Sequence, residues 1–285
     1  MIHRKTALIC SVVLLLIFGV VINTNDEKNV SVQSVKNNVP EGELDFEIDL
    51  SLYGNLKSGN MGWGFKKEKG KAPQIDSYSE ELFGKTNTFY VDKNGGKVLY
   101  LTFDEGYENG YTGKILDVLK EKNVPAAFFI TGHYLKNEEE LVTRMVNEGH
   151  IVGNHTDNHP NLAKSGLDVV RDELKTLNDL FLEKYGKNMV YMRPPEGEYS
   201  EKLLFSVSDM GYKTILWSFA YRDWDVNMQK GAEYAFEQVT PYLHDGAIIL
   251  LHAVSSDNAE ALGKIIDYAR SSGYEFKSLD NLVAK

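Results

Sequence analysis

The sequence predicts an α/β fold, a distorted (β/α) barrel of about seven parallel strands that follows an irregular N-terminal extension. From residue 97 onward, short apolar runs alternate with amphipathic segments, which is typical of βαβ units in a parallel sheet. This region has no nucleotide-binding glycine fingerprint, which favours a closed or nearly closed barrel over an open dinucleotide-binding sheet. Its polar residues also gather where the predicted strands end.

The expected elements alternate regularly along the chain. The expected strands are short runs rich in apolar residues, and they cover residues 98–103, 126–130, 151–153, 190–192, 214–217, 247–251 and 274–276. The segments between them repeat apolar residues at helical spacing, and we expect helices at 138–146, 169–182, 201–210, 232–243 and 259–270. Together they form the domain predicted over residues 97–285.

Residues 1–22 have the pattern of an export segment. Arg4 and Lys5 precede a mostly apolar stretch over residues 6–22. No Ala-x-Ala site follows it, so we favour an uncleaved signal anchor over a cleaved signal peptide. We therefore expect an exported protein, either membrane-anchored or secreted, that meets the membrane only through this segment. Cys10 is the single cysteine, so a disulfide within the chain is excluded.

Two segments connect the export segment to the barrel. Residues 23–45 are polar and poor in aromatics, which suits a flexible stalk. Residues 46–96 are irregular but carry many aromatics, Trp63 and Tyr90 among them, and we expect this extension to pack on the barrel. The net charge of −10 and the lack of a Lys/Arg cluster argue against nucleic acid as a partner. We expect a monomer.

Charged and polar residues stand at or shortly after the ends of the predicted strands. They are Asp104 and Glu105, His155, Arg193, Asp223 and Trp224, and His252. Because the strands of a parallel barrel end on one face, where barrel active sites are built, we expect these residues to share a site. His252 directly follows the buried strand expected over residues 247–251. Because histidine is the usual acid or base near neutral pH, this position favours a functional role for His252.

Several of these residues also have a purely structural interpretation. The spacing of His155 and His159 places two imidazoles on one side of a helical turn, as in metal sites, but it also arises by accident in surface helices. The glycine before the pair and the proline after it favour a loop that follows a strand. Asp104 and Glu105 are compatible with a helix N-cap, and Arg193 with a simple turn.

Taken together, the set indicates metal-assisted chemistry. Two histidines and a carboxylate make an open metal site that leaves positions for water and substrate. If Asp104 and Glu105 continue the strand, their side chains diverge, so one is free to bind metal while the other acts as a base. Adjacent acids do not suit a glycosidase, whose carboxylates face each other across roughly 5–9.5 Å. The remaining histidines, His133, His150 and His244, are expected to have no partners.

The residues in this order resemble the motifs of a known family, the polysaccharide deacetylases of carbohydrate esterase family 4. The matching segments are Thr102-Phe103-Asp104-Glu105-Gly106, His155-Thr156-Asp157-Asn158-His159-Pro160, Arg193-Pro194-Pro195-Glu196-Gly197, Asp223-Trp224 and Leu250-Leu251-His252. The resemblance covers about residues 97–285. It implies a distorted (β/α) barrel that hydrolyses N-acetyl groups of glycans with a divalent metal.

A finer likeness is to the peptidoglycan N-acetylmuramic acid deacetylases that lead to muramic δ-lactam in spore cortex. The segments Phe103–Thr112, His133–Lys136 and Arg144–His155 carry it. It implies action at the cell wall, in the forespore or cortex compartment, on glycan strands whose stem peptides an amidase has removed. The chain departs from the family pattern at Glu105, where a second Asp is usual, and at Glu196, where an aromatic residue is usual.

The resemblance implies a metal site and a base. His155, His159 and Glu105 would hold a divalent metal, for which zinc is expected and cobalt or manganese are the alternatives. Asp104 would take a proton from the attacking water. Arg193 would pair with Asp104 and keep it ionised near neutral pH.

It also implies the remaining parts of a deacetylase site. A backbone N–H of the turn from Pro194 to Gly197 would bind the oxyanion. His252 would protonate the departing amine, and Asp223 would hold its tautomer. Two side chains would line the acetyl pocket, Trp224 and Leu250.

Two alternatives stay open at this stage. One is the same fold with another substrate, as an N-acetylglucosamine deacetylase or another glycan acetyl esterase. The other is a catalytically inactive protein that binds carbohydrate in the cell wall; the presence of Asp104 and His252 argues against it.

Overall fold

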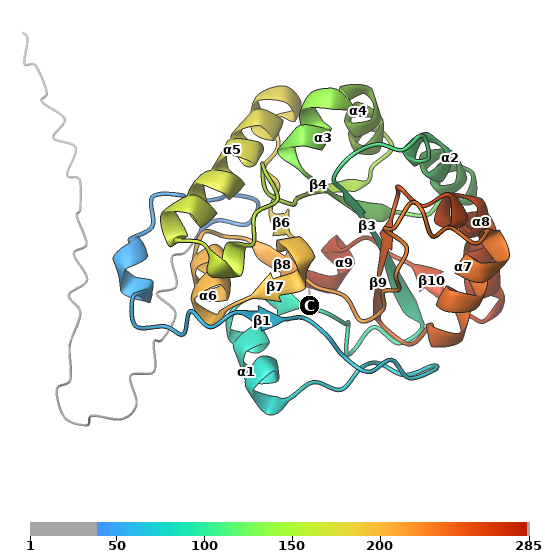
Figure 1. Cartoon of the computed structure of the whole chain (residues 1–285), viewed down its shortest axis with the longest axis horizontal. Coiled ribbons are helices and arrows are strands. Elements are labelled where there is room, and N and C mark those ends of the chain that lie inside the picture. Colours follow the sequence, from blue (N-terminus) through green and yellow to red (C-terminus); the bar gives the residue numbers. More distant parts are fainter. Residues whose placement is uncertain (1–38, 284–285) are drawn as a thin grey trace, which may run out of the picture. The chain divides into compact units, whose positions relative to one another are not determined.

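A curved parallel sheet forms the centre of the fold in the computed structural model, which describes residues 39–283 (Figure 1). The predicted export segment and most of the predicted stalk lie outside the described residues. The main sheet has the order β10 (Glu275–Phe276), β3 (Val98–Glu105), β4 (Ala126–Ile130), β5 (Ile151–Asn154), β6 (Tyr191–Met192), β8 (Lys213–Ile215) and β2 (Thr88–Phe89), and β9 (Ala247–His252) also pairs with β3. All these pairs are parallel, which confirms the predicted fold class.

The sheet is curved, and the segment that follows β8 contacts β9. Ser218 N–H donates to Ile248 O at 3.0 Å, and Leu250 N–H donates to Phe219 O at 2.9 Å. Phe219 and Ile249 form an isolated parallel bridge at the same place. These bonds join the two ends of the curved sheet, so the barrel is nearly closed through an irregular segment.

Helices follow the strands, and most of them cover the outer face of the sheet, whereas the last of them, α9, lies inside the curve of the sheet (Figure 1). They are α1 (Ser77–Lys85), α2 (Thr112–Lys122), α3 (Gly132–Asn137), α4 (Glu139–Asn147), α5 (Leu167–Tyr185), α6 (Glu201–Asp209), α7 (Ala232–Val239), α8 (Ser256–Ser271) and α9 (Asp280–Val283). Side-chain caps start four of them, α1, α3, α6 and α8; at α6, for example, Ser200 Oγ accepts Leu203 N–H, and at α8 Ser255 Oγ accepts Asn258 N–H. The expected helix over 232–243 is shorter, because Pro241 lacks the N–H that an α-helix needs.

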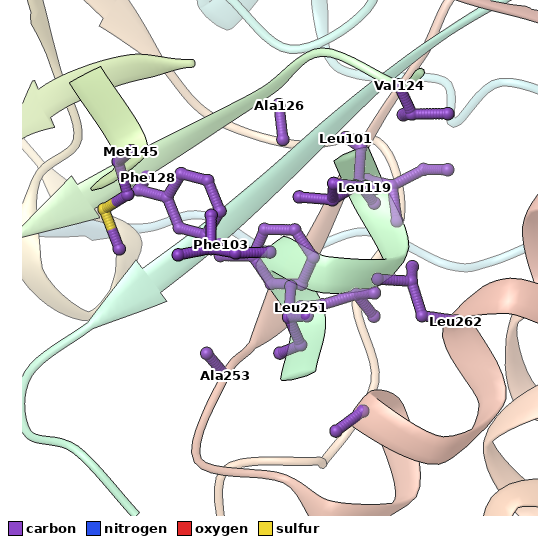
Figure 2. Close-up of a cluster of buried hydrophobic side chains, with 14 of the residues drawn as sticks. Leu101, Phe103, Leu119, Val124, Ala126, Phe128, Met145, Leu251, Ala253 and Leu262 are labelled. Carbon is purple, nitrogen blue, oxygen red and sulfur yellow. The ribbon is translucent and has the colours of Figure 1, made fainter. Parts of the chain in front are cut away.

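Alternate residues of β3 face two different parts of the core. The odd-numbered residues pack outward against α2, α8 and the neighbouring strands. Figure 2 shows Leu101 and Phe103 of this set with Leu119 and Phe128. The rings of Phe103 and Phe128 stack with their centroids 5.2 Å apart. This outer core fixes the strand's rotation about its own axis.

The even-numbered residues of β3 face the interior of the barrel. Val98 and Tyr100 pack there with Phe129 of β4 and with residues from the other strands. Side chains of a strand alternate between its two faces. The same alternation, continued to the end of β3, directs Asp104 into the barrel and Glu105 outward toward the helices.

The N-terminal extension contacts the barrel through strand pairing and side chains. β1 (Met61–Gly62) pairs antiparallel with β7 (Glu198–Tyr199), and β2 pairs with β8. Tyr53 Oη donates to the buried Asp209 Oδ2 at 2.7 Å. Within the described part of the chain, no helix has both the length and the apolar character needed to cross a membrane.

Candidate active site

A pocket of about 1070 Å³ lies at the carboxyl ends of β3, β5 and β9. The residues expected from the sequence that line it are Asp104, His155, His159, Gly197, Trp224, Leu250 and His252. The other expected residues do not line it; they are Glu105, Arg193, Pro194 and Asp223. The strand ends therefore bring most of the expected set to one face of the barrel.

Asp104 is held by a buried arginine. Arg193 is fully buried, and its Nη1 donates to Asp104 Oδ1 at 2.7 Å while its Nη2 donates to Thr102 Oγ1 at 2.9 Å. Burial raises the pKa of Asp104, but the charges of Arg193, His155 and His252 outweigh burial and leave that pKa below its usual value. Asp104 is thus an ionised carboxylate at neutral pH, with one oxygen committed to the arginine and the other directed toward His155.

His155 and His159 lie on a loop, not on a helical turn. Thr156 and His159 have positive φ angles of 71° and 57°. The loop is held by its own side chains, since Asn154 Oδ1 accepts the Thr156 N–H and Thr156 Oγ1 accepts the His159 N–H, both at 2.9 Å. The loop brings the two imidazole rings edge to face, with their centroids 4.8 Å apart.

The tautomer of His155 is set by a backbone carbonyl. Its Nδ1–H donates to Arg193 O at 2.8 Å, which leaves Nε2 as the nitrogen with a free lone pair, 3.6 Å from Asp104 Oδ2. Burial, which outweighs the charge of Asp104, lowers the pKa of His155 to about 4. His155 is therefore neutral near pH 7, the state in which an imidazole binds metal.

Glu105 points away from these groups. Its carboxyl group is fully buried on the helix side of β3, where the Thr112 hydroxyl donates to Oε1 at 3.4 Å and Oε2 has no hydrogen-bond partner among the described residues. Burial, together with the charge of Glu108, raises its pKa well above the usual value. The structure thus does not bring Glu105 to the two histidines, because strand alternation places it on the face opposite Asp104.

His252, on the opposite side of Asp104 from the loop histidines, has a carboxylate partner of its own. Its Nδ1–H donates to Asp223 Oδ1 at 2.7 Å, and its backbone N–H donates to Asp223 Oδ2 at 2.8 Å. Burial lowers the pKa of His252, but the charge and hydrogen bond of the buried Asp223 outweigh it and raise that pKa above 6.5. Asp223 thus holds an imidazole that can be protonated, and Nε2 of this imidazole is available to groups in the pocket.

In the turn after β6, one backbone N–H is not used within the turn and is available to bind an anion. Glu196 and Gly197 have φ angles of 61° and 67°. Pro194 and Pro195 have no N–H, and the Gly197 N–H donates to Pro194 O at 3.1 Å while the Glu198 N–H donates to Pro195 O. The Glu196 amide is therefore the donor in this turn that can face an oxyanion.

The N-terminal extension supports this turn from behind. The Trp63 N–H donates to Gly197 O, and its indole Nε1–H donates to Trp217 O, both at 2.9 Å. A side chain at Gly197 would come within 2.6 Å of the Trp217 ring and 3.3 Å of the Trp63 Cβ. Trp217 lines the pocket, so Trp63 connects the extension to the pocket wall.

The chain matches the family model described as polysaccharide deacetylase over residues 92–215. It is 44% identical over 225 residues to the peptidoglycan-N-acetylmuramic acid deacetylase PdaA of Bacillus subtilis, covering 78% of this chain and 86% of that protein. The chain belongs to the polysaccharide deacetylase family, carbohydrate esterase family 4. It is an enzyme, a polysaccharide N-deacetylase.

Further relatives agree with this family. The solved structure of Bacillus subtilis PdaA, a family 4 carbohydrate esterase, matches with a TM-score of 0.78 and 43% identity over 80% of this chain and 99% of that chain. A peptidoglycan-N-acetylglucosamine deacetylase of Bacillus cereus is 31% identical over 195 residues, or 67% of this chain and 90% of that protein. The deacetylase family thus includes relatives named for either sugar.

Deacetylases of this family generally depend on a metal, and the described residues fit that requirement in part. His155 and His159 fit it, because their rings are adjacent and the tautomer of His155 leaves Nε2 available. Among residues 39–283, no group of three or more His, Cys, Asp or Glu side chains is placed to hold a metal ion. The protein therefore offers two imidazoles as ligands, and Glu105 does not complete the set in this conformation.

Several pocket residues were not expected from the sequence. Trp224, which was expected, lines the pocket at its rim, with its side chain 53% exposed. Tyr107, 48% exposed, lines the pocket just after β3. His133 and Lys136 of α3 line it as well. They fall inside the segments Phe103–Thr112 and His133–Lys136, which carry the finer likeness to the muramic acid deacetylases, but no role in the site was expected for them.

The expectation that the remaining histidines have no partners was wrong. His244 is bonded through its ring to Tyr242 O and the Ser218 hydroxyl, both at 2.8 Å. His150 Nδ1 accepts the Ala126 N–H at 3.2 Å. The bonds to Ser218 and Ala126 join residues that are distant in the sequence, so local spacing does not show them.

Proposed function

We propose that this protein hydrolyses the N-acetyl group of N-acetylmuramic acid in peptidoglycan, and that the product leads to muramic δ-lactam in spore cortex. The observation that carries the reaction is that Asp104 and His252 face one pocket, each with its own charged partner. The 44% identity to PdaA, against 31% to the N-acetylglucosamine deacetylase of Bacillus cereus, supports muramic acid as the substrate.

Asp104 acts as the general base in this proposal. Arg193 keeps it ionised, and the carboxylate oxygen that is not bonded to Arg193 takes a proton from the attacking water. The Glu196 amide stabilises the negative charge on the acetyl oxygen as the tetrahedral intermediate forms. Both groups are fixed before substrate binds, so little reorganisation is needed during the reaction.

His252 acts as the general acid. Asp223 raises its pKa, and its Nε2 gives a proton to the sugar nitrogen as the C–N bond breaks. The products are acetate and a free amine. In muramic acid this amine then attacks the lactyl carboxyl of the same sugar with loss of water, a ring closure favoured because both groups belong to one molecule.

For the cofactor, we propose a divalent ion, zinc before cobalt or manganese, held by His155 and His159. When bound, such an ion would supply Lewis acidity toward the acetyl carbonyl and would lower the pKa of a bound water. Chelation should abolish acetate release and zinc addition should restore it. If the chelated enzyme contains no zinc by elemental analysis and still releases acetate, this assignment is wrong.

The export pattern of residues 1–22 supports a location outside the cytoplasmic membrane, and peptidoglycan, for which the relatives are named, lies there. We propose that the protein acts at the cell wall, in the forespore or cortex compartment, anchored or released through residues 1–22. Its substrate there would be glycan strands whose stem peptides an amidase has removed, and it would act as a monomer.

Mass spectrometry of defined glycans tests the substrate. A stem-peptide-free muramic glycan should lose acetyl, and acetyl plus water where the lactam closes, whereas an N-acetylglucosamine oligosaccharide should change little. Asp104→Asn should reduce acetate release by roughly 100-fold or more while the protein stays folded. Deacetylation of glucosamine alone by the unchanged enzyme would contradict the proposed substrate.

A further inference from the structure

The lining of the pocket carries a lysine among several carboxylates. The lining includes the carboxylates of Asp104, Asp157 and Glu196. Lys136 is the one lysine or arginine among the lining residues that the structure describes. The protonated His252 and the ion proposed at the two loop histidines are engaged in the reaction itself, so Lys136 is the cation of the lining that remains to attract a negatively charged substrate group.

Lys136 is held beside the two loop histidines. Its Nζ lies 2.9 Å from Asp157 Oδ1. Asp157 stands two residues from both His155 and His159, which limits its Cα to roughly 7 Å from either of theirs. The ammonium group therefore lies on the side of the pocket that the histidine loop forms.

The position of α3 is independent of this ion pair. The Gly132 N–H, at the start of the helix, donates to Thr156 O at 3.1 Å and to Asp157 O at 3.2 Å. A Cβ on Gly132 would lie 1.7 Å from Asp157 Oδ1, so the helix and the histidine loop are in direct contact. A partly exposed ion pair adds only about 0–1 kcal/mol to this packing. Lys136 is thus not needed to hold the loop.

The ammonium group retains capacity for a ligand. The Lys136 side chain is 53% exposed, whereas that of Asp157 is 12% exposed. Lysine has three N–H donors, and Asp157 takes one of them. Asp157 Oδ2 is bonded separately to Asn158 Nδ2 at 3.2 Å. Donors of Lys136 therefore remain free to face the pocket.

We propose that Lys136 binds the carboxylate of the lactyl group of muramic acid. This inference rests on the proposed function. In that sugar the lactyl ether is on the carbon next to the one that bears the acetamido group, so its carboxylate must lie close to the reacting acetyl. N-acetylglucosamine has a neutral hydroxyl there and gains nothing from a cation. An attached stem peptide turns the carboxylate into a neutral amide, so Lys136 also selects glycan from which the peptide has been removed.

Two substrates that differ in this charge alone test the proposal. One is a muramic glycan with a free lactyl carboxylate, and the other is the same glycan with that group converted to its primary amide. The unchanged enzyme should prefer the carboxylate. Lys136→Met should lower kcat/KM on the carboxylate by roughly 10- to 100-fold and remove the preference, and Lys136→Arg should restore most of it.

A matched control and a binding measurement complete the test. Lys264 is similarly exposed, at 55%, and is paired with Glu233 at 2.6 Å, but it does not line the pocket. Lys264→Met should leave the preference unchanged. Free muramic acid should inhibit the unchanged enzyme more strongly than its amide does, and Lys136→Met should abolish that difference without any need for turnover.

The outcomes separate this inference from the proposed function. An equal loss on both substrates, or no loss on either, would overturn the role of Lys136 while leaving muramic deacetylation intact. An unchanged enzyme that deacetylates glucosamine and ignores muramic acid would overturn both.

Discussion

Asp104 and Glu105 are neighbours in the sequence with opposite electrostatic environments. Asp104 faces Arg193 inside the barrel, and its pKa is lowered, whereas Glu105 is buried among helix residues, and its pKa is raised well above the usual value. The cause is the change of face between consecutive strand residues. Asp104 is thus prepared for proton transfer, whereas the burial of Glu105 lowers the stability of the fold when its carboxyl group is ionised.

Glu105→Gln should stabilise the protein at alkaline pH. Because burial raises the pKa of Glu105 in the folded state, the stability of the unchanged protein is complete below the unfolded pKa and is lost as pH rises through the folded pKa. Removing the ionisable group removes that loss. Thermal unfolding at pH 8 should show a higher Tm for the variant, by roughly 2–4 °C for each kcal/mol gained.

Thermal unfolding of the same two proteins at acidic pH is the control. At pH 4 the two proteins should unfold at similar temperatures, because Glu105 is protonated in both states. A variant that binds less zinc than the unchanged protein would show instead that Glu105 reaches the metal in solution.

Asp223→Asn should change the pH dependence of catalysis. The general acid must be protonated, so activity falls as pH rises through the pKa of His252, which Asp223 raises. Without that charge, the alkaline limb of the kcat/KM profile should move to lower pH, and kcat should fall by roughly 100-fold or more. A profile whose alkaline limb stays in place would assign the acid to another group.

At the scale of elements, the short strand β1 supports the active-site turn. Trp63 bonds the carbonyls of Gly197 and Trp217, and its ring packs on Phe83 and Tyr90 at centroid distances of 5.4 and 5.2 Å. This part of the chain precedes residue 92, where the family match begins. The turn's geometry thus depends on residues outside that match.

Trp63→Phe should lower kcat more than it raises KM. A smaller aromatic ring remains at this position, but the indole N–H that holds Trp217 O is lost, and the turn that carries the Glu196 amide becomes less fixed. A fall of roughly 2- to 10-fold is expected for one hydrogen bond, mainly in kcat, since an oxyanion donor acts in the transition state.

Tyr53→Phe is the matched control in the same extension. It removes a buried bond of 2.7 Å to Asp209, far from the turn in the sequence and outside the pocket lining. It should lower Tm without changing kcat. An equal effect of both variants on kcat would show that Trp63 has no specific positioning role.

The sequence predicted the strands of the barrel well, because buried parallel strands are apolar on both faces and stand out from their surroundings. β2 was missed, since Thr88–Phe89 is too short to show a period and pairs only with the distant β8. The strand ends predicted which residues meet at the pocket. They did not predict that Glu105 turns away, because alternation separates two neighbours without saying which of them faces inward.

At the scale of the whole molecule, the barrel and the extension form one folding unit. β2 pairs with β8, and Val91 bridges Ala247 of β9, so residues before β3 contact both ends of the curved sheet. A chain that begins at residue 97 exposes the apolar surface that Phe83 and Tyr90 cover. It should unfold at a lower temperature than a chain that begins at residue 39, or fail to fold. Equal Tm values for the two chains would show that the barrel is stable alone.

Arg193 contacts both halves of the catalytic centre at once. Its side chain holds the carboxylate of Asp104, and its carbonyl holds the imidazole of His155. A single residue, fully enclosed by the barrel, thus sets the separation of two reactive groups that come from different strands. It follows that substitutions at 104, 155 and 193 should not act additively, because each of these residues contacts the other two.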